Sequence, residues 1–479
     1  MTDTSQSSFN IVKSNGNYDL TIIGAGSAGF SAAITAAEQG ARVALIGHGT
    51  IGGTCVNFGC VPSKTLIRAA EAVHHANTAG RFHGIHAEGR VVDWKAMIAQ
   101  KDELVGELRQ VKYMDLLPEY SNVGYIEGLA RFTAKGVTVN GEPLKTDKII
   151  IASGSSPAVP TIPGIENVPY LTSTTAFELE ELPHSVVIIG GGYIGCEIGQ
   201  MLSRCGVDTT IVTRSRLLPE AEPEISEALA GILRDEGITL YDSLSYKKIS
   251  QIGSGIELNV LVNGIDQSIF AEKLLLTTGR VPNTGELDLD IGNIDTSSRG
   301  DVTIDDRMRT SRTGVYAAGD VTGNDQFVYM AAYGAKIAAE NALNGDSRRY
   351  DNTAMPAVVF TDPQVASVGL TEAGATASGY SVVTSVLPLK HVPRALAARD
   401  TRGLIKLVAN AENKQLLGAH ILAPEGADSI QTAALAIRNK MTFVELGEMI
   451  FPYLTTVEGL KLAAQTFEMD VSKLSCCAG

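Results

Sequence analysis

Two stretches of the chain share one pattern of hydrophobic and polar positions. In the first, an apolar run over residues 20–23 enters a glycine-rich loop, which is followed by an Ala-rich helix and an apolar strand over 42–46. In the second, an apolar run over 186–189 enters another glycine-rich loop, followed by a helix and a strand over 208–212. Strand, glycine loop, helix and strand form the βαβ unit of dinucleotide-binding domains. Because two such units are far stronger evidence than one glycine motif, the pattern predicts two nucleotide-binding domains.

Each of the two loops has the spacing Gly-x-Gly-x-x-Gly. Glycine lets the backbone approach a pyrophosphate, and the N-terminus of the following helix offers unpaired N–H groups with a partial positive charge. A tight turn in a generic α/β sheet would explain one such loop but hardly both. The predicted pyrophosphate-binding glycines are Gly24, Gly26 and Gly29 in the first loop and Gly190, Gly192 and Gly195 in the second.

The hydrophobic and polar pattern changes twice along the rest of the chain. The second unit ends near residue 280, and residues 314–320 form an apolar strand that closes on an acidic residue. From residue 355 onward the pattern becomes that of a separate α+β domain. The sequence therefore predicts an α/β protein with two Rossmann-like dinucleotide-binding domains and a C-terminal α+β domain. The division that we expect is a flexible tail over 1–17, a first nucleotide domain over 18–160 and 284–350, a second over 161–283, and the C-terminal domain over 351–479.

Composition narrows the possible partners of this 479-residue chain. Its formal net charge is −14, which argues against a nucleic-acid partner because such a partner calls for a basic face. No run of about 18 apolar residues is present to span a membrane. Residues 1–17 lack the features of a signal peptide. We therefore expect a cytoplasmic protein.

Four of the six cysteines form two close pairs. Cys55 and Cys60 follow the first nucleotide unit, and Cys476 and Cys477 stand near the chain end. Six cysteines are too few for a disulfide framework in so long a chain, and their clustering indicates redox or metal chemistry in a reducing compartment. A terminal pair can carry a soft metal ion or a disulfide to the first pair, and the pairs alone leave both open. For the remaining two cysteines, Cys196 and Cys205, we expect apolar packing.

The Cys-x4-Cys segment, the second glycine loop and the segment Ala-Ala-Gly-Asp ending at Asp320 together resemble the flavoprotein disulfide reductases. This resemblance covers residues 18–479 and implies that the C-terminal domain is a dimerisation domain. Within the family, the segment Phe-Pro-Tyr-Leu-Thr-Thr-Val-Glu-Gly-Leu-Lys-Leu at 451–462 and the ending Lys-Leu-Ser-Cys-Cys-Ala-Gly at 473–479 are similar to mercuric reductases.

The resemblance implies roles for individual residues. Cys55 and Cys60 would form the redox-active disulfide, with Cys60 against the flavin and Cys55 toward the substrate. A helix beginning near Cys60 would favour its thiolate. Lys64 would pair with Glu197 beside the flavin, although a surface charge is the alternative for Lys64. The implied FAD contacts are Gly24, Gly26, Gly29, Gly53, Thr54, Lys64, Gly154 and Asp320, and the implied NADPH contacts are Gly190, Gly192, Tyr193, Gly195, Arg214, Arg216 and Gly279.

Three of these positions, together with Gly47, indicate how the two cofactors are bound. Tyr193 resembles the family aromatic that covers the flavin until nicotinamide displaces it, with loop packing as the alternative. Arg214 and Arg216 follow the strand over 208–212, where an NAD enzyme usually has an acidic residue. Because two arginines suit a 2′-phosphate, we expect NADPH rather than NADH, with a solvated basic turn as the alternative. Gly47 departs from the family, which usually has Glu there for the adenosine ribose of FAD.

The choice between a metal and a disulfide substrate depends on one missing histidine. Disulfide-reducing family members carry His-Pro-Thr-x-x-Glu near the C-terminus, and the histidine protonates the leaving thiol. Here the aligned stretch runs from Tyr453 to Glu458, and Tyr, with an ordinary pKa of about 10, is a poor substitute near neutral pH. Reduction of thiolate-bound Hg(II) needs no such acid. Tyr453 and Tyr113 resemble the tyrosines that line the family's metal site, although Tyr113 also suits an aromatic core.

The interpretation that follows is an FAD-containing homodimer that oxidises NADPH and reduces Hg(II) to elemental mercury. Hg(II) would come from small-thiol complexes to Cys476 and Cys477, and pass to Cys55 and Cys60 of the other subunit. The competing interpretation is a disulfide reductase like thioredoxin reductase, with a terminal redox tail. A mercury-sequestering protein would not need the second glycine loop, and a structural zinc site lacks its tetrahedral set of ligands.

Overall fold

The computed structural model describes residues 17–470, and the chain divides into two compact units. The division falls inside two helices, α3 (Cys60–Asn77) and α4 (Trp94–Arg109). Among the described residues, unit 1 comprises 17–63, 98–158 and 279–351, and unit 2 comprises 64–97, 159–278 and 352–470.

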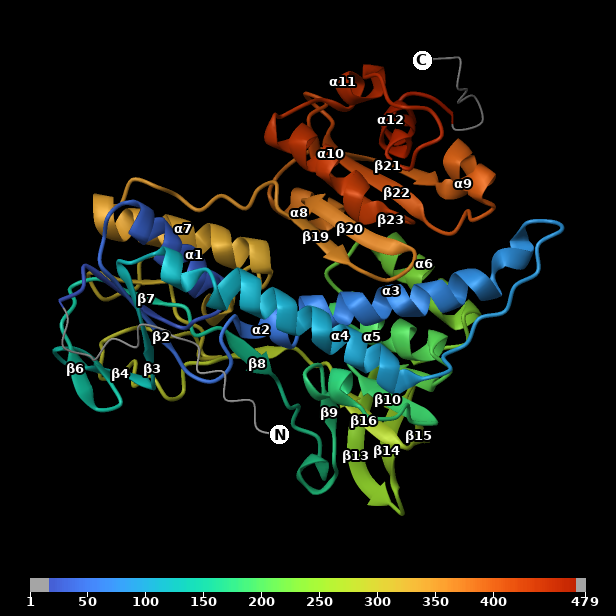
Figure 1. Cartoon of the computed structure of the whole chain (residues 1–479). Helices are drawn as coiled ribbons and strands as arrows, with labels where there is room; N and C mark the ends of the chain where they lie inside the picture. Colours follow the sequence, from blue (N-terminus) through green and yellow to red (C-terminus); the bar gives the residue numbers. More distant parts are fainter. Residues whose placement is uncertain (1–16, 471–479) are drawn as a thin grey trace. The chain divides into compact units, whose positions relative to one another are not determined.

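A five-stranded parallel sheet forms the centre of unit 1 (Figure 1). Its central strands are fully buried apolar runs, as expected for parallel strands covered on both faces. In spatial order the strands are β18 (Val315–Ala317), β7 (Ile149–Ile151), β1 (Leu20–Ile23), β2 (Val43–Gly47) and β3 (Val123–Glu127).

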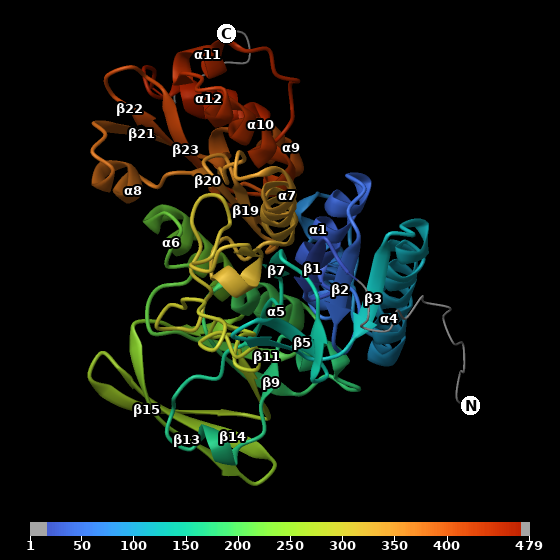
Figure 2. The same ribbon diagram turned by 90° about the vertical axis from the view of Figure 1, so that its left-hand side faces the viewer.

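The two faces of this sheet have different cover. Helices α1 (Ser27–Glu38) and α7 (Val328–Asn344) lie side by side on one face (Figure 2), where they share a core with Leu20 and Leu45. The alternate residues of the same strands, such as Ile23, pack on a small antiparallel sheet. That sheet consists of β4 (Ala130–Thr133), β5 (Gly136–Val139) and β6 (Glu142–Leu144).

Several short elements complete unit 1. They are helix α2 (Gly53–Asn57), the π-helical turn η2 (Gln110–Met114), the 3-10 turns η3 (Leu117–Glu119) and η6 (Asp320–Thr322), and the antiparallel pair β8 (Ser155–Pro157) and β17 (Arg280–Pro282).

Unit 2 contains a second five-stranded parallel sheet, which carries helices α5 (Tyr193–Arg204) and α6 (Pro223–Asp235). Its strands in spatial order are β12 (Thr239–Tyr241), β11 (Asp208–Val212), β10 (Ser185–Ile189), β16 (Lys273–Leu276) and β9 (Leu171–Thr172). An antiparallel sheet packs its apolar face on β10, and consists of β13 (Leu244–Ile252), β14 (Gly255–Val262) and β15 (Ile265–Ala271). Three 3-10 turns accompany these sheets, η1 (Ala79–Arg81), η4 (Ile165–Asn167) and η5 (Thr175–Glu178).

The C-terminal part of unit 2 is an antiparallel sheet with helices packed on it. Its strands in spatial order are β19 (Pro356–Val359), β20 (Gln364–Gly369), β23 (Leu416–Ala423), β22 (Leu404–Asn410) and β21 (Val382–Pro388). The helices are α8 (Glu372–Ala377), η7 (Leu389–His391), α9 (Pro393–Ala398), α10 (Gly426–Arg438), α11 (Phe443–Glu448) and α12 (Glu458–Gln465). Helices α10, α11 and α12 share one core with β20, β22 and β23.

The predicted fold class is confirmed. The strands predicted over 20–23 and 208–212 are β1 and β11, and both glycine loops lie between a parallel strand and a helix. The small antiparallel sheets β4–β6 and β13–β15 are additions that the hydrophobic pattern did not reveal. Within residues 17–470 the structure has no helix that is long and apolar enough to cross a bilayer.

Candidate functional site

The first glycine loop is built so that backbone alone can occupy it. Gly24 has φ +120°, and a Cβ placed on it would lie 2.1 Å from the carbonyl oxygen of Ala152. A Cβ on Gly29 would lie 1.8 Å from the carbonyl oxygen of Gly24. Helix α1 begins after Gly26 with neither a capping side chain nor an acidic residue in its first turn. Its first N–H groups therefore point toward the loop and suit an anion.

The cysteine segment packs directly on this glycine loop. The Gly52 N–H donates to the carbonyl oxygen of Ala25 at 2.9 Å. A Cβ on Gly53 would lie 2.6 Å from the Cα of Gly26, so only glycine allows the two loops to touch. Asn57 braces the segment by donating to the carbonyl oxygens of Ile51 and Gly53. The thiol-bearing segment is therefore held in place against the predicted dinucleotide loop.

The two thiols of this segment lie on successive helices. Cys55 is in α2, and Cys60 is the first residue of the 18-residue helix α3, where the sequence predicted a helix to begin. Both residues are half-buried. The partial positive charge at a helix N-terminus favours a thiolate at Cys60 over a neutral thiol.

Tyr113 lies beside the cysteine pair in unit 1. It sits in the π-helical turn η2, stacks edge-to-face on Phe30 with ring centroids 4.8 Å apart, and has its hydroxyl 3.5 Å from that of Ser27. Burial raises the pKa of Tyr113, the hydrogen bond with Ser27 lowers it, and the nearby Cys55 and Cys60 raise it further. Tyr113 thus combines core packing with a position close to both thiols, and it stays a neutral phenol near pH 7.

A polar group that the sequence analysis missed lies in the same unit. Arg280 donates from Nε to the Ser155 hydroxyl at 2.7 Å, and this hydroxyl donates to Asp320 Oδ2 at 2.7 Å. Burial lowers the pKa of the Arg280 guanidinium, while Asp320 and Cys60 raise it. A buried cation near Cys60 favours the thiolate. Arg280 follows Gly279, the first residue of the last segment of unit 1, and this assignment to unit 1 comes from the structure.

The residues of unit 1 fit FAD. The loop glycines leave no room for side chains, and the α1 N-terminus offers its N–H groups to a pyrophosphate. The hydroxyl of Ser153, two residues after β7, is buried and has no hydrogen-bond partner among residues 17–470. The next residue, Gly154, has φ +73°. These features would hold the dinucleotide, with Asp320 at the edge of the same site.

The second glycine loop repeats the first one in unit 2. A Cβ on Gly190 would lie 2.4 Å from the carbonyl oxygen of Thr277, and a Cβ on Gly195 would lie 2.1 Å from that of Gly190. Gly192 precedes α5, and among residues 17–470 only its chain neighbours come within 4 Å of its Cβ position, which leaves open space before the helix. Tyr193 is the first residue of α5, and burial together with the charge of Glu220 raises its pKa.

The two predicted phosphate-binding arginines have different surroundings. Both are exposed after β11. Arg216 donates from one nitrogen to the carbonyl oxygens of Pro219 and Ala221, at 2.9 and 2.7 Å, and so braces its own loop. Arg214 lies close enough to Tyr246 to lower the pKa of that phenol, which burial raises overall to about 12. Arg214 is therefore the arginine that is available to an anion.

The predicted pair of Lys64 and Glu197 is present in unit 2. The Lys64 ammonium donates to Glu197 Oε2 at 2.7 Å and lies 4.7 Å from the centroid of the Phe360 ring. The other oxygen of Glu197 accepts the Phe360 N–H at 2.9 Å. With 33% of its side chain exposed, Lys64 is more than the solvated surface charge that was the alternative.

In unit 2, Tyr453 lies in the loop between α11 and α12, and Glu458 is the first residue of α12. Tyr453 is 55% exposed. Glu458, which aligns with the acid that orients the histidine in disulfide-reducing members, is buried and accepts the N–H of Leu454 at 3.1 Å. Its carboxylate therefore braces the loop. The terminal pair Cys476 and Cys477 lies outside the described residues.

Both remaining cysteines are buried: Cys196 lies on α5, and Cys205 directly follows the end of that helix. Burial raises the pKa of each thiol to about 12, and the charge of Glu197 adds to this effect at Cys196. Both therefore stay protonated and inert, as the predicted apolar packing implies.

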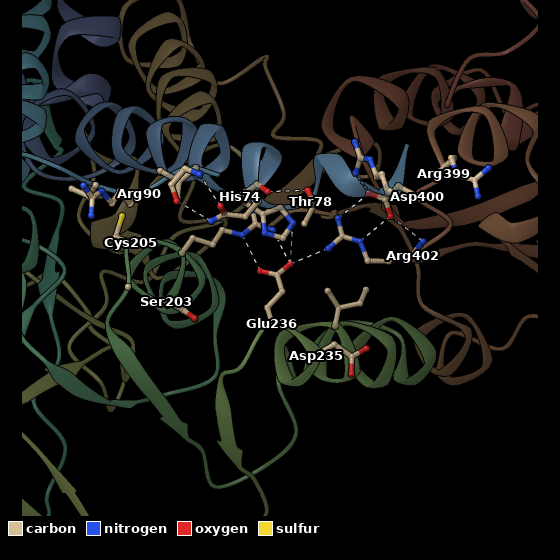
Figure 3. Close-up of a pocket in the computed structure, with 18 of the residues that line it drawn as sticks. His74, Thr78, Arg90, Ser203, Cys205, Asp235, Glu236, Arg399, Asp400 and Arg402 are labelled. Carbon is tan, nitrogen blue, oxygen red and sulfur yellow. Dashed lines mark hydrogen bonds and ion pairs between the residues drawn. The ribbon is translucent and has the colours of Figure 1, made fainter. Parts of the chain in front are cut away.

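A cavity of about 740 Å³ in unit 2 carries a different group of charges (Figure 3). At its centre, Glu236 accepts hydrogen bonds from Arg204 at 2.7 and 2.8 Å and from Arg402 at 2.9 Å. His74 lies 3.9 Å from the same carboxylate, and burial followed by the charge of Arg204 lowers its pKa. The opposite charges in this cavity are paired, and its lining includes none of the predicted catalytic or cofactor residues. We therefore assign this charged group a structural role.

Comparison with known families agrees with this geometry. Residues 18–339 match the family model described as pyridine nucleotide-disulphide oxidoreductase, and residues 355–464 match the dimerisation domain of the same family. The chain belongs to the pyridine nucleotide-disulphide oxidoreductases. The matched dimerisation domain supports a homodimer.

Individual relatives show which members of this family the chain is similar to. The mercuric reductase of Lysinibacillus sphaericus is 48% identical over 465 residues, which cover 97% of this chain and 85% of the relative. That of Streptomyces lividans is 46% identical over 98% of this chain and 100% of its own length. A solved structure, the HOCl-induced flavoprotein disulfide reductase RclA from Escherichia coli, superposes with a TM-score of 0.82 at 31% identity, covering 94% of this chain and 99% of that one. Within this family the chain is thus similar, over nearly its whole length, to mercuric reductases.

Proposed function

We propose that this enzyme binds Hg(II) between the thiolates of Cys55 and Cys60 and delivers to it the two electrons of NADPH, which releases elemental mercury. FAD, when bound, supplies the transfer of electrons from the nicotinamide to the thiolate-bound metal. The observation that carries the proposal is the contact of the cysteine segment with the first glycine loop, through Gly53 on Gly26. This contact supports a soft-metal ligand pair close to the loop that is proposed to bind the cofactor's pyrophosphate.

The surroundings of the cysteine pair support metal binding by thiolates. The start of helix α3 and the buried guanidinium of Arg280 both favour the anionic form of Cys60. Tyr113 lies close to both thiols and supplies a neutral phenol, which contacts a bound ion without competing for it. The proposed roles of Tyr113 and Tyr453 are to line the metal site.

Proton chemistry separates this proposal from disulfide reduction. Reduction of a disulfide substrate needs an acid that protonates the leaving thiolate, whereas elemental mercury leaves uncharged. The loop after α11 has Tyr453 where disulfide-reducing members have histidine, and Glu458 is engaged with the backbone of Leu454. This arrangement favours the metal over the disulfide.

We propose further that Cys476 and Cys477 take Hg(II) from small-thiol complexes and pass it to Cys55 and Cys60 of the partner subunit. Transfer between thiolate pairs keeps the ion ligated at every step, so no free Hg(II) is released. Thiolates at both ends require a reducing compartment, which agrees with a cytoplasmic location.

The preference for NADPH is assigned to Arg214. Its guanidinium is exposed after β11 and can bind a 2′-phosphate, whereas Arg216 donates hydrogen bonds to carbonyl oxygens of its own loop. Lys64 and Glu197, joined at 2.7 Å, are proposed to lie beside the flavin, and Tyr193 is proposed to cover it until the nicotinamide binds.

The relay is tested with the double variant Cys476→Ala/Cys477→Ala in the FAD-loaded enzyme. Anaerobic NADPH oxidation with Hg(II) in excess small thiol is expected to be lost, while reduction of the flavin by NADPH stays normal. Cys205→Ala, which removes a buried thiol directly after α5, is the matched control and is expected to retain turnover. Unchanged turnover in the double variant would contradict the relay.

The choice of substrate is tested with the unmodified enzyme. NADPH oxidation is measured with Hg(II), glutathione disulfide, lipoamide and oxidised thioredoxin as alternative acceptors. We expect oxidation with Hg(II) alone, together with release of volatile mercury. Oxidation driven by a disulfide would favour the thioredoxin-reductase-like alternative and would make the terminal cysteines a thiol–disulfide shuttle.

A further inference from the structure

The end of strand β2 lacks the residue that dinucleotide-binding units usually have there. About 20 residues after the glycine loop, such units carry an acidic side chain that binds the ribose hydroxyls of the adenosine. This chain has Gly47 as the last residue of β2. We infer that Glu127, at the end of the neighbouring strand β3, replaces that acid and binds the adenosine ribose of FAD, while Tyr125 fills the vacated place.

Tyr125 excludes any side chain at position 47. A Cβ on Gly47 would lie 2.4 Å from the Tyr125 hydroxyl oxygen, 2.8 Å from its Cε2 and 2.9 Å from the Cβ of Ala25. Real Cβ atoms essentially never come within 3.0 Å of another heavy atom, so a carboxylate on β2 requires the Tyr125 ring to leave this position. The glycine is therefore part of a local rearrangement that involves the next strand.

The register of the sheet places Glu127 where it can take over. Gly47 pairs with Glu127 in the parallel ladder, and the Gly128 N–H donates to the carbonyl oxygen of Gly47 at 2.8 Å. Adjacent strands lie about 4.8 Å apart, and directly paired residues face the same side of the sheet. A glutamate on β3 thus starts one strand spacing from the usual position of the acid, a distance comparable to the length of its own side chain.

The surroundings of Glu127 suit a diol ligand. Its side chain is exposed at the carboxyl edge of the sheet, which is where ligands of open α/β sheets bind. Burial raises the pKa of Tyr125, and the charge of Glu127 raises it further, so this charge acts on the phenol that covers Gly47. A carboxylate accepts hydrogen bonds from both hydroxyls of a ribose, and such charge-assisted bonds are the strong ones.

The test compares binding of FAD and of its 2′-deoxyadenosine analogue to the apoprotein, followed by quenching of flavin fluorescence. For Glu127→Gln we expect FAD binding to weaken about tenfold and analogue binding to change much less, because the analogue lacks one hydroxyl. Glu142→Gln, an exposed carboxylate on β6 of the same unit, is the matched control and should leave both affinities unchanged. Equal weakening for both ligands, or none for either, would overturn the assignment.

A second pair of variants tests the exchange of positions. Gly47→Glu alone should weaken FAD binding because Tyr125 occupies the space. Gly47→Glu combined with Tyr125→Val should recover it, and Glu127→Gln should then cost little in this background. If Gly47→Glu binds FAD as well as the unmodified protein does, the steric argument is wrong. Activity toward Hg(II) is not a readout in these assays, so their failure would leave the proposed function untouched.

Discussion

Replacing Glu197 by Gln tests whether its ion pair with Lys64 stabilises unit 2. The Glu197 side chain is only 7% exposed, and its two oxygens accept from Lys64 at 2.7 Å and from the Phe360 N–H at 2.9 Å. Gln retains an acceptor for the Phe360 N–H but leaves the ammonium without its counter-charge. Removing one partner of a fully buried pair costs about 3–5 kcal/mol. Because Lys64 is 33% exposed, water replaces part of the lost interaction, and we expect about 1–3 kcal/mol.

The assay is urea unfolding of the FAD-loaded protein at pH 7, in a cycle of Glu197→Gln, Lys64→Met and the double variant. The cycle should show a coupling free energy of about 1 kcal/mol or more, since the two side chains are in direct contact. Glu197→Ala should be less stable than Glu197→Gln by about 1 kcal/mol, because it also strands the Phe360 N–H. The control is Glu181→Gln, whose partner Lys95 lies 3.8 Å away with both side chains mostly exposed, and it should change little. A coupling near zero would refute the reasoning.

Three further predictions concern other parts of the molecule. Gly53→Ala should abolish FAD retention, measured as flavin absorbance after gel filtration, because its Cβ would collide with the first glycine loop. Gly40→Ala, also at positive φ but with no atom within 4 Å, should keep the flavin, and equal loss in both variants would point to backbone strain instead. Arg214→Ala should raise the KM for NADPH roughly tenfold or more while leaving that for NADH nearly unchanged, and a parallel rise would exclude phosphate recognition. Burial lowers the pKa of His74 and His420 below 6.5. As the pH falls, these two imidazoles therefore bind protons more readily in the unfolded chain than in the folded chain. The free energy of unfolding should therefore fall as the pH drops below about 6.5. This decrease should be less steep in His74→Gln. If the free energy of unfolding of this variant depends on pH as steeply as that of the unmodified protein, His74 does not contribute.

Features that depend on short spacings were accessible from the sequence. The apolar runs, the two glycine loops and the Cys-x4-Cys pair each lie within a few residues, and a strand, a turn and a helix N-terminus follow from such local patterns. The resulting expectation of strands over 20–23 and 208–212 agrees with β1 and β11. The small antiparallel sheets escaped because their strands are half-exposed and owe their order to pairing with neighbours.

Sequence patterns alone predict the two nucleotide units and the thiol pair, and the family resemblance adds the expected cofactors. The side chains that support these sites become visible only in the folded chain. Arg280 reaches Ser155 across 125 positions, and Tyr125 occupies the space beside Gly47 although 78 positions separate the two. No periodicity encodes such contacts, because they arise when separate strands and loops pack at the same edge of a sheet. There, the volume and charge of each side chain are set against neighbours that are distant along the chain.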